Sequence, residues 1–181
     1  MRLPAMRGFT LIELMISVAV LGVLLAVVAP SFNNFFDKYR VRRAADTFSS
    51  FLINAKSEAI KRNKSVVTVI TGNGATWCAG MTEAATCNCT STTTGACQID
   101  GVARVIASTA FTGVTLLGPT TDTTTPYVFE FKTNRGTITG GNNSVQLQSA
   151  AGLKLNVVVG QFGRIRLCSP DGSISGYPTS C

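Results

Sequence analysis

The feature that most constrains this chain is a long apolar run close to its N-terminus. Residues 9–29 read FTLIELMISVAVLGVLLAVVA and carry a single ionisable side chain, Glu13. About 20 helical residues of this kind cross the roughly 30 Å hydrocarbon core of a bilayer. The short flank before the run holds Arg2 and Arg7 and no acid, which is typical of a cytoplasmic N-terminus. We therefore expect residues 9–30 to form a helix that belongs in a membrane or in a filament core.

The same run differs from an ordinary secretory signal peptide. Such a signal has a shorter apolar region that is followed by a small-residue cleavage site. Here the candidate cleavage site, between Gly8 and Phe9, precedes the run. Glu13 is unusual as well, because an unpaired carboxylate inside an apolar segment is costly. Either Glu13 lies near the lipid headgroups, or it is a functional residue with a charged partner.

Residues 8–13, with the sequence GFTLIE, and the apolar run that ends before Pro30 resemble the class III signal of type IV pilins and type II secretion pseudopilins. The resemblance implies that a prepilin peptidase cuts after Gly8, which removes the leader peptide of residues 1–8, and that the new N-terminal Phe9 is methylated. It also implies that Glu13 pairs with the N-terminal amine of a neighbouring pilin during assembly, which offsets the cost of burying both charges. The protein is then expected in the inner membrane, as a single-pass protein with a periplasmic C-terminal domain. It would later join other major and minor pilins in the pilus on the cell surface.

Beyond the apolar run, the sequence continues with the pattern of an amphipathic helix. Apolar residues recur at steps of three and four from Phe32 to Ile60, and neither proline nor glycine interrupts residues 31–63. We therefore predict one helix from residue 9 to residue 63, whose amphipathic part, residues 31–64, packs on a globular domain. Four bases follow the span, and we interpret them as a solvated face at the membrane surface or, second, as contacts between subunits: Lys38, Arg40, Arg42 and Arg43.

Residues 65–181 have the pattern of a small β-rich domain. Short β-branched runs alternate with turn signals, and the predicted strands cover residues 65–71, 104–110, 112–117, 127–133, 144–148, 153–159 and 164–168. With the long helix they predict an α+β fold of the type IV pilin kind, in which one helix is laid against one or two small antiparallel sheets. Residues 77–97 are rich in Thr, Ala and Cys and poor in large apolar side chains. We expect this segment to be a surface insertion.

The chain has six cysteines and no histidine. The absence of histidine excludes Ser-His-Asp and Cys-His nucleophile systems. In an oxidising periplasm the cysteines are expected to form disulfides. The preferred arrangement pairs Cys168 with Cys181 and keeps the other four together, with the pairing among those four left open: Cys78, Cys87, Cys89 and Cys97. Zinc binding is the alternative, although the spacings lack the closely spaced cysteine pair of a zinc knuckle.

The net charge of +7 is unevenly placed, and residues 126–181 hold five bases against two acids. In the segment from Gly163 to Leu167, Arg164 and Arg166 are two residues apart, and such residues share one face of a strand. We therefore predict that Ile165 and Leu167 face the core, while the two guanidiniums form an exposed site for phosphate oxygens. Gly163 would let another backbone approach closely. The bases that could extend this electropositive patch are Lys132, Arg135 and Lys154.

The whole chain is similar to the FimT/FimU/GspH group of minor pilins and pseudopilins. Its G-R-x-R segment at residues 163–166 resembles the motif with which FimT-type minor pilins bind DNA during natural transformation. The resemblance implies a minor pilin, most like FimT, that binds double-stranded DNA without sequence preference. The alternative is a purely structural role, as a FimU-like priming pilin or as a GspH-like pseudopilin of a type II secretion system. We expect no enzymatic activity, cofactor or metal, because the few carboxylates show no paired arrangement and no glycine-rich phosphate loop leads into a helix.

Overall fold

The computed structural model describes residues 8–93, 95–118, 126–133, 135–139 and 143–181, apart from the side chains of residues 27–31 and 33. Most of the expected leader peptide, residues 1–7, lies outside the described residues. The chain divides into two units, Met1–Phe36 and Asp37–Cys181. One helix, α1 (Leu11–Arg62), contributes residues to both units, and this confirms the predicted helix to within two residues at each end.

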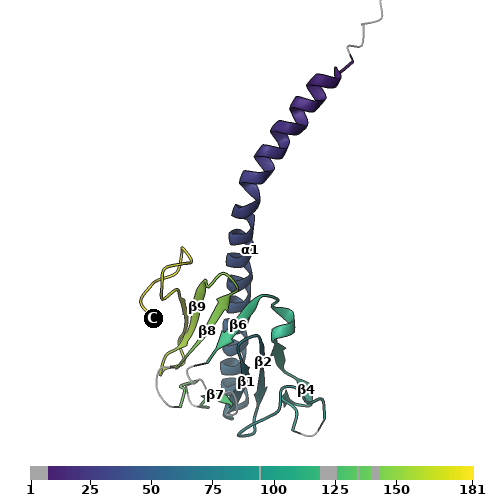
Figure 1. Cartoon of the computed structure of the whole chain (residues 1–181). Coiled ribbons are helices and arrows are strands. Elements are labelled where there is room, and N and C mark those ends of the chain that lie inside the picture. Colours follow the sequence, from purple (N-terminus) through teal and green to yellow (C-terminus); the bar gives the residue numbers. More distant parts are fainter. Residues whose placement is uncertain (1–7, 94, 119–125, 134, 140–142) are drawn as a thin grey trace, which may run out of the picture. The chain divides into compact units, whose positions relative to one another are not determined.

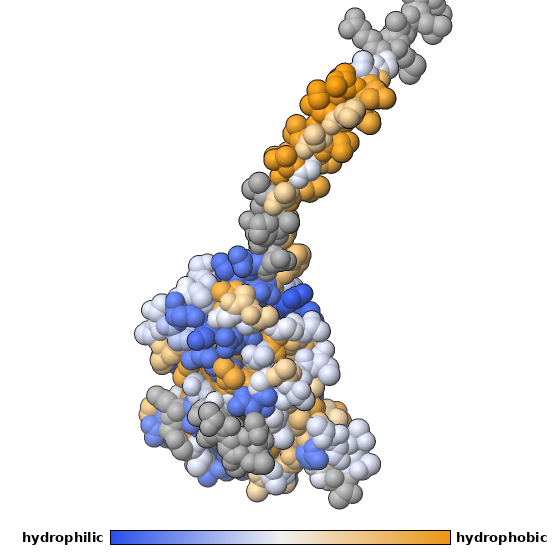
Figure 2. Space-filling view, in the orientation of Figure 1, coloured by the Kyte–Doolittle hydropathy of each residue, from blue (hydrophilic) through white to orange (hydrophobic). Residues whose placement is uncertain are grey.

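In the first unit, α1 carries exposed apolar side chains (Figure 2). Every side chain from Leu11 to Ala26 is exposed. Among the residues that the structure describes, no helix combines the length and the apolar character that crossing a bilayer requires.

The start of α1 carries a side-chain N-cap. Thr10 precedes the first helical residue, and its hydroxyl accepts a hydrogen bond of 3.3 Å from the backbone N–H of Glu13. Threonine followed three residues later by glutamate is the sequence signature of a helix N-terminus. A carboxylate in the first turn also interacts favourably with the helix dipole. Glu13 therefore has a local role at the start of α1, whatever its role between subunits.

In the second unit, two four-stranded antiparallel sheets lie beside the C-terminal half of α1 (Figure 1). The first sheet has the order β5-β2-β1-β7, with β1 at Val66–Asn73, β2 at Thr76–Thr82, β5 at Val105–Ala107 and β7 at Tyr127–Phe131. The second has the order β10-β9-β8-β6, with β6 at Val114–Leu117, β8 at Asn143–Ser149, β9 at Lys154–Val159 and β10 at Ile165–Cys168. A small hairpin, β3 (Gln98–Ile99) and β4 (Val102–Ala103), and the 3-10 turn η1 (Ser108–Ala110) complete the described elements. The architecture confirms the predicted α+β fold.

One apolar core joins the helix to both sheets. The buried stripe of α1 repeats at steps of three and four, as expected for an amphipathic helix, and consists of Val41, Ala44, Ala45, Phe48, Phe51, Leu52, Ala55 and Ala59. Large buried side chains from both sheets complete the same core: Trp77, Leu116, Phe129, Phe131, Leu147 and Leu155. The sheets also touch directly, because the backbones of Gly74 and Leu116 exchange hydrogen bonds of 2.7 and 2.9 Å.

The segment expected to be a surface insertion, residues 77–97, is only partly at the surface. Its first residues belong to β2, which pairs with β1 on one side and β5 on the other. Trp77, Ala79 and Met81 face the core. The expectation was wrong for this part because β2 is buried along nearly its whole length, so it lacks the alternation that marks a half-exposed strand.

The rest of the insertion covers the outer face of the first sheet. The disulfides Cys78–Cys89 and Cys87–Cys97 pack there against Val67 and Val69 in a second apolar cluster. A Cβ added at Gly80 would lie 2.3 Å from the Cβ and Sγ of Cys97, so only glycine fits beneath this cluster. The insertion therefore has a small core of its own, which its disulfides supply.

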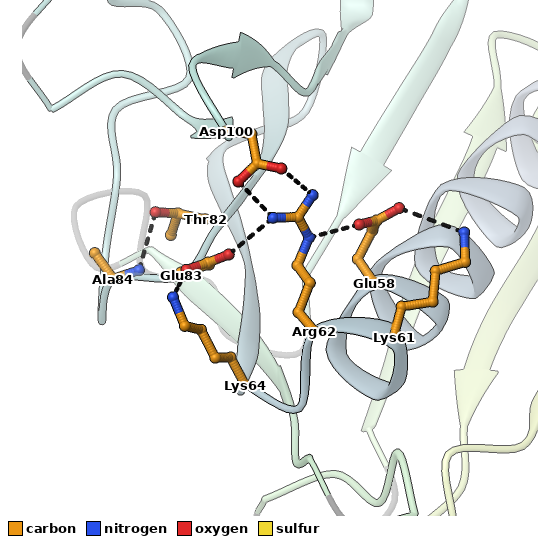
Figure 3. Close-up of polar contacts among 8 residues, drawn as sticks. All are labelled: Glu58, Lys61, Arg62, Lys64, Thr82, Glu83, Ala84 and Asp100. Carbon is orange, nitrogen blue, oxygen red and sulfur yellow. Dashed lines mark hydrogen bonds and ion pairs between the residues drawn. The ribbon is translucent and has the colours of Figure 1, made fainter.

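The last turn of α1 is tied to the β3–β4 hairpin by Arg62 (Figure 3). Its guanidinium contacts Glu58 at 2.7 Å, Asp100 at 2.5 Å and Glu83 at 3.3 Å, and Lys64 contacts Glu83 at 2.9 Å. Hydrogen bonds from Arg62 hold the pKa of Glu58 and of Asp100 below the usual range. For Glu83, the hydrogen bond from Lys64 is the main cause of a lowered pKa.

Candidate functional site

Arg164 and Arg166 lie beside the turn that joins β9 to β10. Two backbone hydrogen bonds close this turn, from the N–H of Gly163 to the carbonyl of Gly160 at 2.7 Å and from the N–H of Gly160 to the carbonyl of Arg164 at 2.8 Å. Both arginine side chains are exposed. The predicted alternation is confirmed, because the two apolar residues between and after them pack against the core: Ile165 and Leu167.

Gly163 holds this turn against a second loop of the same domain. Its backbone adopts a φ of +67°, in the left-handed region that favours glycine. A Cβ added at Gly163 would lie 1.9 Å from the carbonyl oxygen of Gly136. The N–H of Ile138 also donates to the carbonyl of Gln161 at 3.1 Å. The close backbone approach predicted for Gly163 is therefore an approach to loop 132–139.

Lys56 of α1 supports the same turn from beneath, and the sequence reasoning missed it. Its ammonium donates a hydrogen bond of 2.9 Å to the carbonyl of Gly163. Its side chain runs along Gly136, where an added Cβ would lie 2.6 Å from the lysine Cε. One signal was available in the sequence. Lys56 lies four residues after Leu52 and three before Ala59, which places a base within the buried stripe of the helix.

Loop 132–139, which contacts the turn through Gly136 and Ile138, carries two of the predicted helper bases. Arg135 is exposed and directly precedes Gly136, which contacts Gly163. Lys132 is also exposed, but its ammonium lies 3.5 Å from the carboxylate of Glu130. A hydrogen bond from Thr139, followed by the charge of Lys132, holds the pKa of Glu130 below its usual range. Arg135 is therefore better placed than Lys132 to add free positive charge.

Lys154 lies on the same face of the sheet as Arg166, but farther along it. Arg166 is paired with Val158 in the β9–β10 register, and Lys154 lies four residues from Val158 on β9, or about 13 Å at the rise of a strand. The polar side chains of Gln146 and Asn156, which are hydrogen-bonded to each other at 3.0 Å, share this face. The patch can thus extend from the arginine pair across the sheet to Lys154.

The C-terminal segment forms one edge of the candidate site. The disulfide Cys168–Cys181 closes this segment, and the carbonyl of Cys181 accepts a hydrogen bond of 2.6 Å from Nη2 of Arg166. On the other side of the segment, Arg42 of α1 donates to the carbonyl of Ser175 at 2.6 Å. The segment is therefore fixed to both the helix and the sheet, and it holds one nitrogen of the Arg166 guanidinium in place.

A shallow hollow lies at the tip of the hairpin. Its lining combines turn residues with the arginine pair: Gly160, Gln161, Phe162, Arg164 and Arg166. The side chain of Phe162 is 78% exposed, more than any other large apolar side chain described in the second unit. The sequence reasoning singled out the arginines and not this phenylalanine, because one aromatic residue in a turn carries no periodic signal.

The charged side chains that line and flank the hollow are positive. Within the described parts of the chain, Arg135, Lys154 and Arg164 take part in no ion pair, whereas Arg166 already donates a hydrogen bond of 2.6 Å to the main-chain oxygen of Cys181. Exposed guanidiniums of this kind can bind phosphate oxygens through charge-assisted hydrogen bonds. Proteins that bind single-stranded nucleic acids use positively charged groups for the phosphates and exposed aromatic rings for the bases.

The structure leaves no thiolate for a metal. All six cysteines are in disulfides, so the zinc alternative is excluded for them. Among the described residues, no group of three or more potential acidic, cysteine or histidine ligands lies close enough to hold a metal ion.

The remaining predicted site residues belong to the first unit. Gly8, Phe9 and Glu13 are all exposed there, and this exposure is compatible with access by a processing enzyme. Their processing and assembly roles remain predictions.

Comparison with known proteins gives matches at both ends of the chain. Residues 4–29 match the prokaryotic N-terminal methylation motif. Two fimbrial proteins of Pseudomonas aeruginosa are 37% identical over 81 residues, which is 45% of this chain and 52% of each relative. The chain thus spans about half the length of these curated relatives. The crystal structure of the type IV minor pilin FimU of Pseudomonas aeruginosa aligns with a TM-score of 0.46 and 17% identity, over 70% of this chain and 90% of that one.

The globular domain gives the broadest sequence match. Residues 44–175, well over half of the chain, match the family described as type II transport protein GspH. Proteins of this family are structural subunits and not enzymes, in agreement with the expectation from the residues. With the methylation motif before it, the matched domain shows that this chain belongs to the GspH family of minor pilins and pseudopilins.

Proposed function

We propose that this chain is a minor type IV pilin of the FimT kind, which binds DNA for uptake during natural transformation. The family match does not distinguish FimT-type from FimU-type or GspH-type members, so the proposal rests on the site itself. The observation that carries it is the exposed pair Arg164 and Arg166, which lies beside a turn fixed by Gly163 and Lys56. The guanidinium of Arg166 is held by the main-chain oxygen of Cys181, and a guanidinium that is already held binds phosphate oxygens with little further loss of side-chain freedom.

The proposed ligand is double-stranded DNA, bound through its phosphates and without sequence preference. Phosphate contacts position a protein on DNA but read no bases. Arg135 and Lys154 extend the positive surface on either side of the arginine pair. Lys132 contributes less because Glu130 lies 3.5 Å from its ammonium.

The N-terminal segment would serve processing and assembly. A prepilin peptidase would cut after Gly8, and Phe9 would then be methylated, as the matched motif implies. Inner-membrane anchoring would precede assembly with other major and minor pilins, during which Glu13 would pair with a neighbouring N-terminal amine. The DNA site lies in the second unit and needs none of these residues for its geometry.

The first test measures binding of fluorescent duplex DNA to the full chain in detergent, across a series of salt concentrations. Each phosphate contact contributes about 0.9 to the slope of log K against log salt. The Arg164→Ala/Arg166→Ala variant should therefore bind more weakly and lose about 1.8 from that slope. The matched control is Arg43→Ala/Arg104→Ala, which removes the same charge from exposed positions outside the hollow and should retain most of the affinity.

Two results would contradict the proposal. If the wild-type chain does not bind duplex DNA at low salt, the DNA function is wrong. If both double variants lose affinity equally, general charge and not this site explains binding.

In the organism that encodes the chain, a deletion strain complemented with Arg164→Ala/Arg166→Ala should assemble pili but lose DNA uptake. Loss of pili in that strain would instead favour the structural role of a FimU-like or GspH-like subunit.

A further inference from the structure

The exposed ring of Phe162 gives the candidate site a second kind of chemistry. A single exposed apolar side chain is ordinary on a protein surface, so its exposure alone decides nothing. Its position is the informative part, because the ring lines the same hollow as Arg164 and Arg166. Within the described residues, Phe162 belongs to neither apolar cluster and makes no ring contact with another aromatic side chain.

The backbone of the turn holds the ring at the tip of the hairpin. Phe162 precedes Gly163, whose N–H closes the turn onto Gly160 at 2.7 Å. The carbonyl of Gly163 is in turn bound by Lys56 at 2.9 Å. A ring carried on a turn that is fixed from beneath loses little conformational freedom when a flat ligand covers it.

We infer that the hollow binds an unpaired nucleobase, which stacks on Phe162 while its flanking phosphates contact Arg164 and Arg166. The inference rests on the proposed DNA function and names the form of DNA that this site favours. A neutral aromatic face beside two guanidiniums is complementary to a base joined to phosphates. Inside an intact duplex both faces of each base are covered by its neighbours. Only single strands, overhangs and frayed ends offer a free face, so these bind more tightly than a closed duplex.

The test uses the full chain in detergent and three probes of equal length. They are a mixed-sequence single strand, the same strand with abasic sites throughout, and a duplex whose two ends are each closed by a linker that contains no bases. Fluorescence anisotropy gives the affinity of each. The abasic strand keeps the phosphates and lacks the bases, and the closed duplex lacks free ends. The wild-type chain should bind the intact single strand more tightly than either of the other probes.

Two substitutions at Phe162 separate stacking from apolar burial. Phe162→Leu keeps an apolar side chain without a ring, and Phe162→Trp keeps a ring. Stacking on one base changes affinity by about five- to 150-fold, so Phe162→Leu should weaken single-strand binding within that range, while Phe162→Trp restores it. Neither substitution should change binding of the closed duplex or of the abasic strand. Because the side chain is 78% exposed, both variants should fold like the wild type.

The outcomes distinguish this inference from the function on which it rests. If Arg164→Ala/Arg166→Ala leaves closed-duplex binding intact, the proposed function fails. If that variant loses duplex binding but Phe162→Leu binds the single strand like the wild type, only the stacking inference is overturned. It is also overturned if the wild type binds abasic and intact strands equally. Stacking is overturned as well if Phe162→Leu binds the single strand with wild-type affinity while Phe162→Ala binds it more weakly. That result would assign an apolar contact, and not stacking, to the side chain of Phe162.

Discussion

Replacing Gly163 by alanine tests whether the arginine pair depends on a backbone contact between two loops. The alanine must adopt the φ of +67° that glycine has now. Its Cβ would lie 1.9 Å from the carbonyl oxygen of Gly136 and 3.2 Å from the ammonium of Lys56. The first distance is far inside van der Waals contact with a backbone atom, so the two loops must separate.

The cost has two parts. The left-handed conformation costs an alanine about 1–2 kcal/mol. Separation of the loops also breaks the hydrogen bond from Lys56 to Gly163, and a hydrogen bond to a charged group contributes about 1.5–3 kcal/mol. We therefore expect Gly163→Ala to lower the free energy of unfolding by about 2.5–5 kcal/mol. That is a large share of the stability of an ordinary domain.

Gly74→Ala is the matched control. Gly74 has a φ of +75°, but a Cβ there would meet nothing within 4 Å. Gly74→Ala should lower the free energy of unfolding only by the cost of the left-handed conformation, about 1–2 kcal/mol. Denaturant unfolding can be followed by the fluorescence of Trp77, which is the single tryptophan of the chain and is 3% exposed. If Gly163→Ala and Gly74→Ala lower the free energy of unfolding equally, the argument that contact with Gly136 requires glycine at residue 163 is refuted.

The other predictions concern the core, the disulfides and acid stability. Thr68→Val should stabilise the domain by about 1 kcal/mol in denaturant unfolding, because the Thr68 hydroxyl is buried without a hydrogen-bond partner; a loss of stability would mean that the hydroxyl is satisfied. Cys87→Ala/Cys97→Ala should cost about 2–3 kcal/mol by the same measurement, from release of a loop with a sequence separation of 10 residues, and an unchanged midpoint would contradict the role of this disulfide. Arg62 lowers the pKa values of the carboxyls it contacts, so its stabilising effect is present above the ordinary carboxyl pKa of about 4 and is lost as the pH falls below it. Arg62→Met should therefore be less stable than wild type at neutral pH and approach it in acid, and a constant difference across a pH series of unfolding curves would exclude this linkage.

The sequence predicted best those parts of the fold that depend on local periodicity. The helix extends over nearly the predicted residues because steps of three and four continue from Val41 to Ala59. β2 was missed because one face packs on the core and the other lies under the disulfides of its own insertion. The segment predicted as a strand at residues 104–110 is shorter, because Ser108–Ala110 forms a 3-10 turn.

The candidate site was predictable only in part, for a related reason. Alternation along one strand was enough to place Arg164 and Arg166 on the exposed face. The contacts of Gly163 with Gly136 and Lys56 join residues that are far apart in the sequence, and no local pattern encodes them. The pairing of the four cysteines within the insertion could not be predicted for the same reason, since spacing does not determine which cysteines meet.

The structure also changes the meaning of the basic residues on α1. The sequence suggests a solvated face for the bases that follow the apolar run, Arg42 among them, yet Arg42 and two later bases of the helix hold parts of the domain in place. Arg42 binds the C-terminal segment, Lys56 binds the turn before Arg164, and Arg62 binds the β3–β4 hairpin. Two of these three contacts support the edges of the candidate site. The charge of the helix therefore acts on the candidate site mainly by fixing the turn and the segment beside the arginine pair, because a site held on rigid elements keeps its geometry when ligand binds. A loss of DNA affinity in Lys56→Met that Lys56→Arg restores would be the signature of this positioning role.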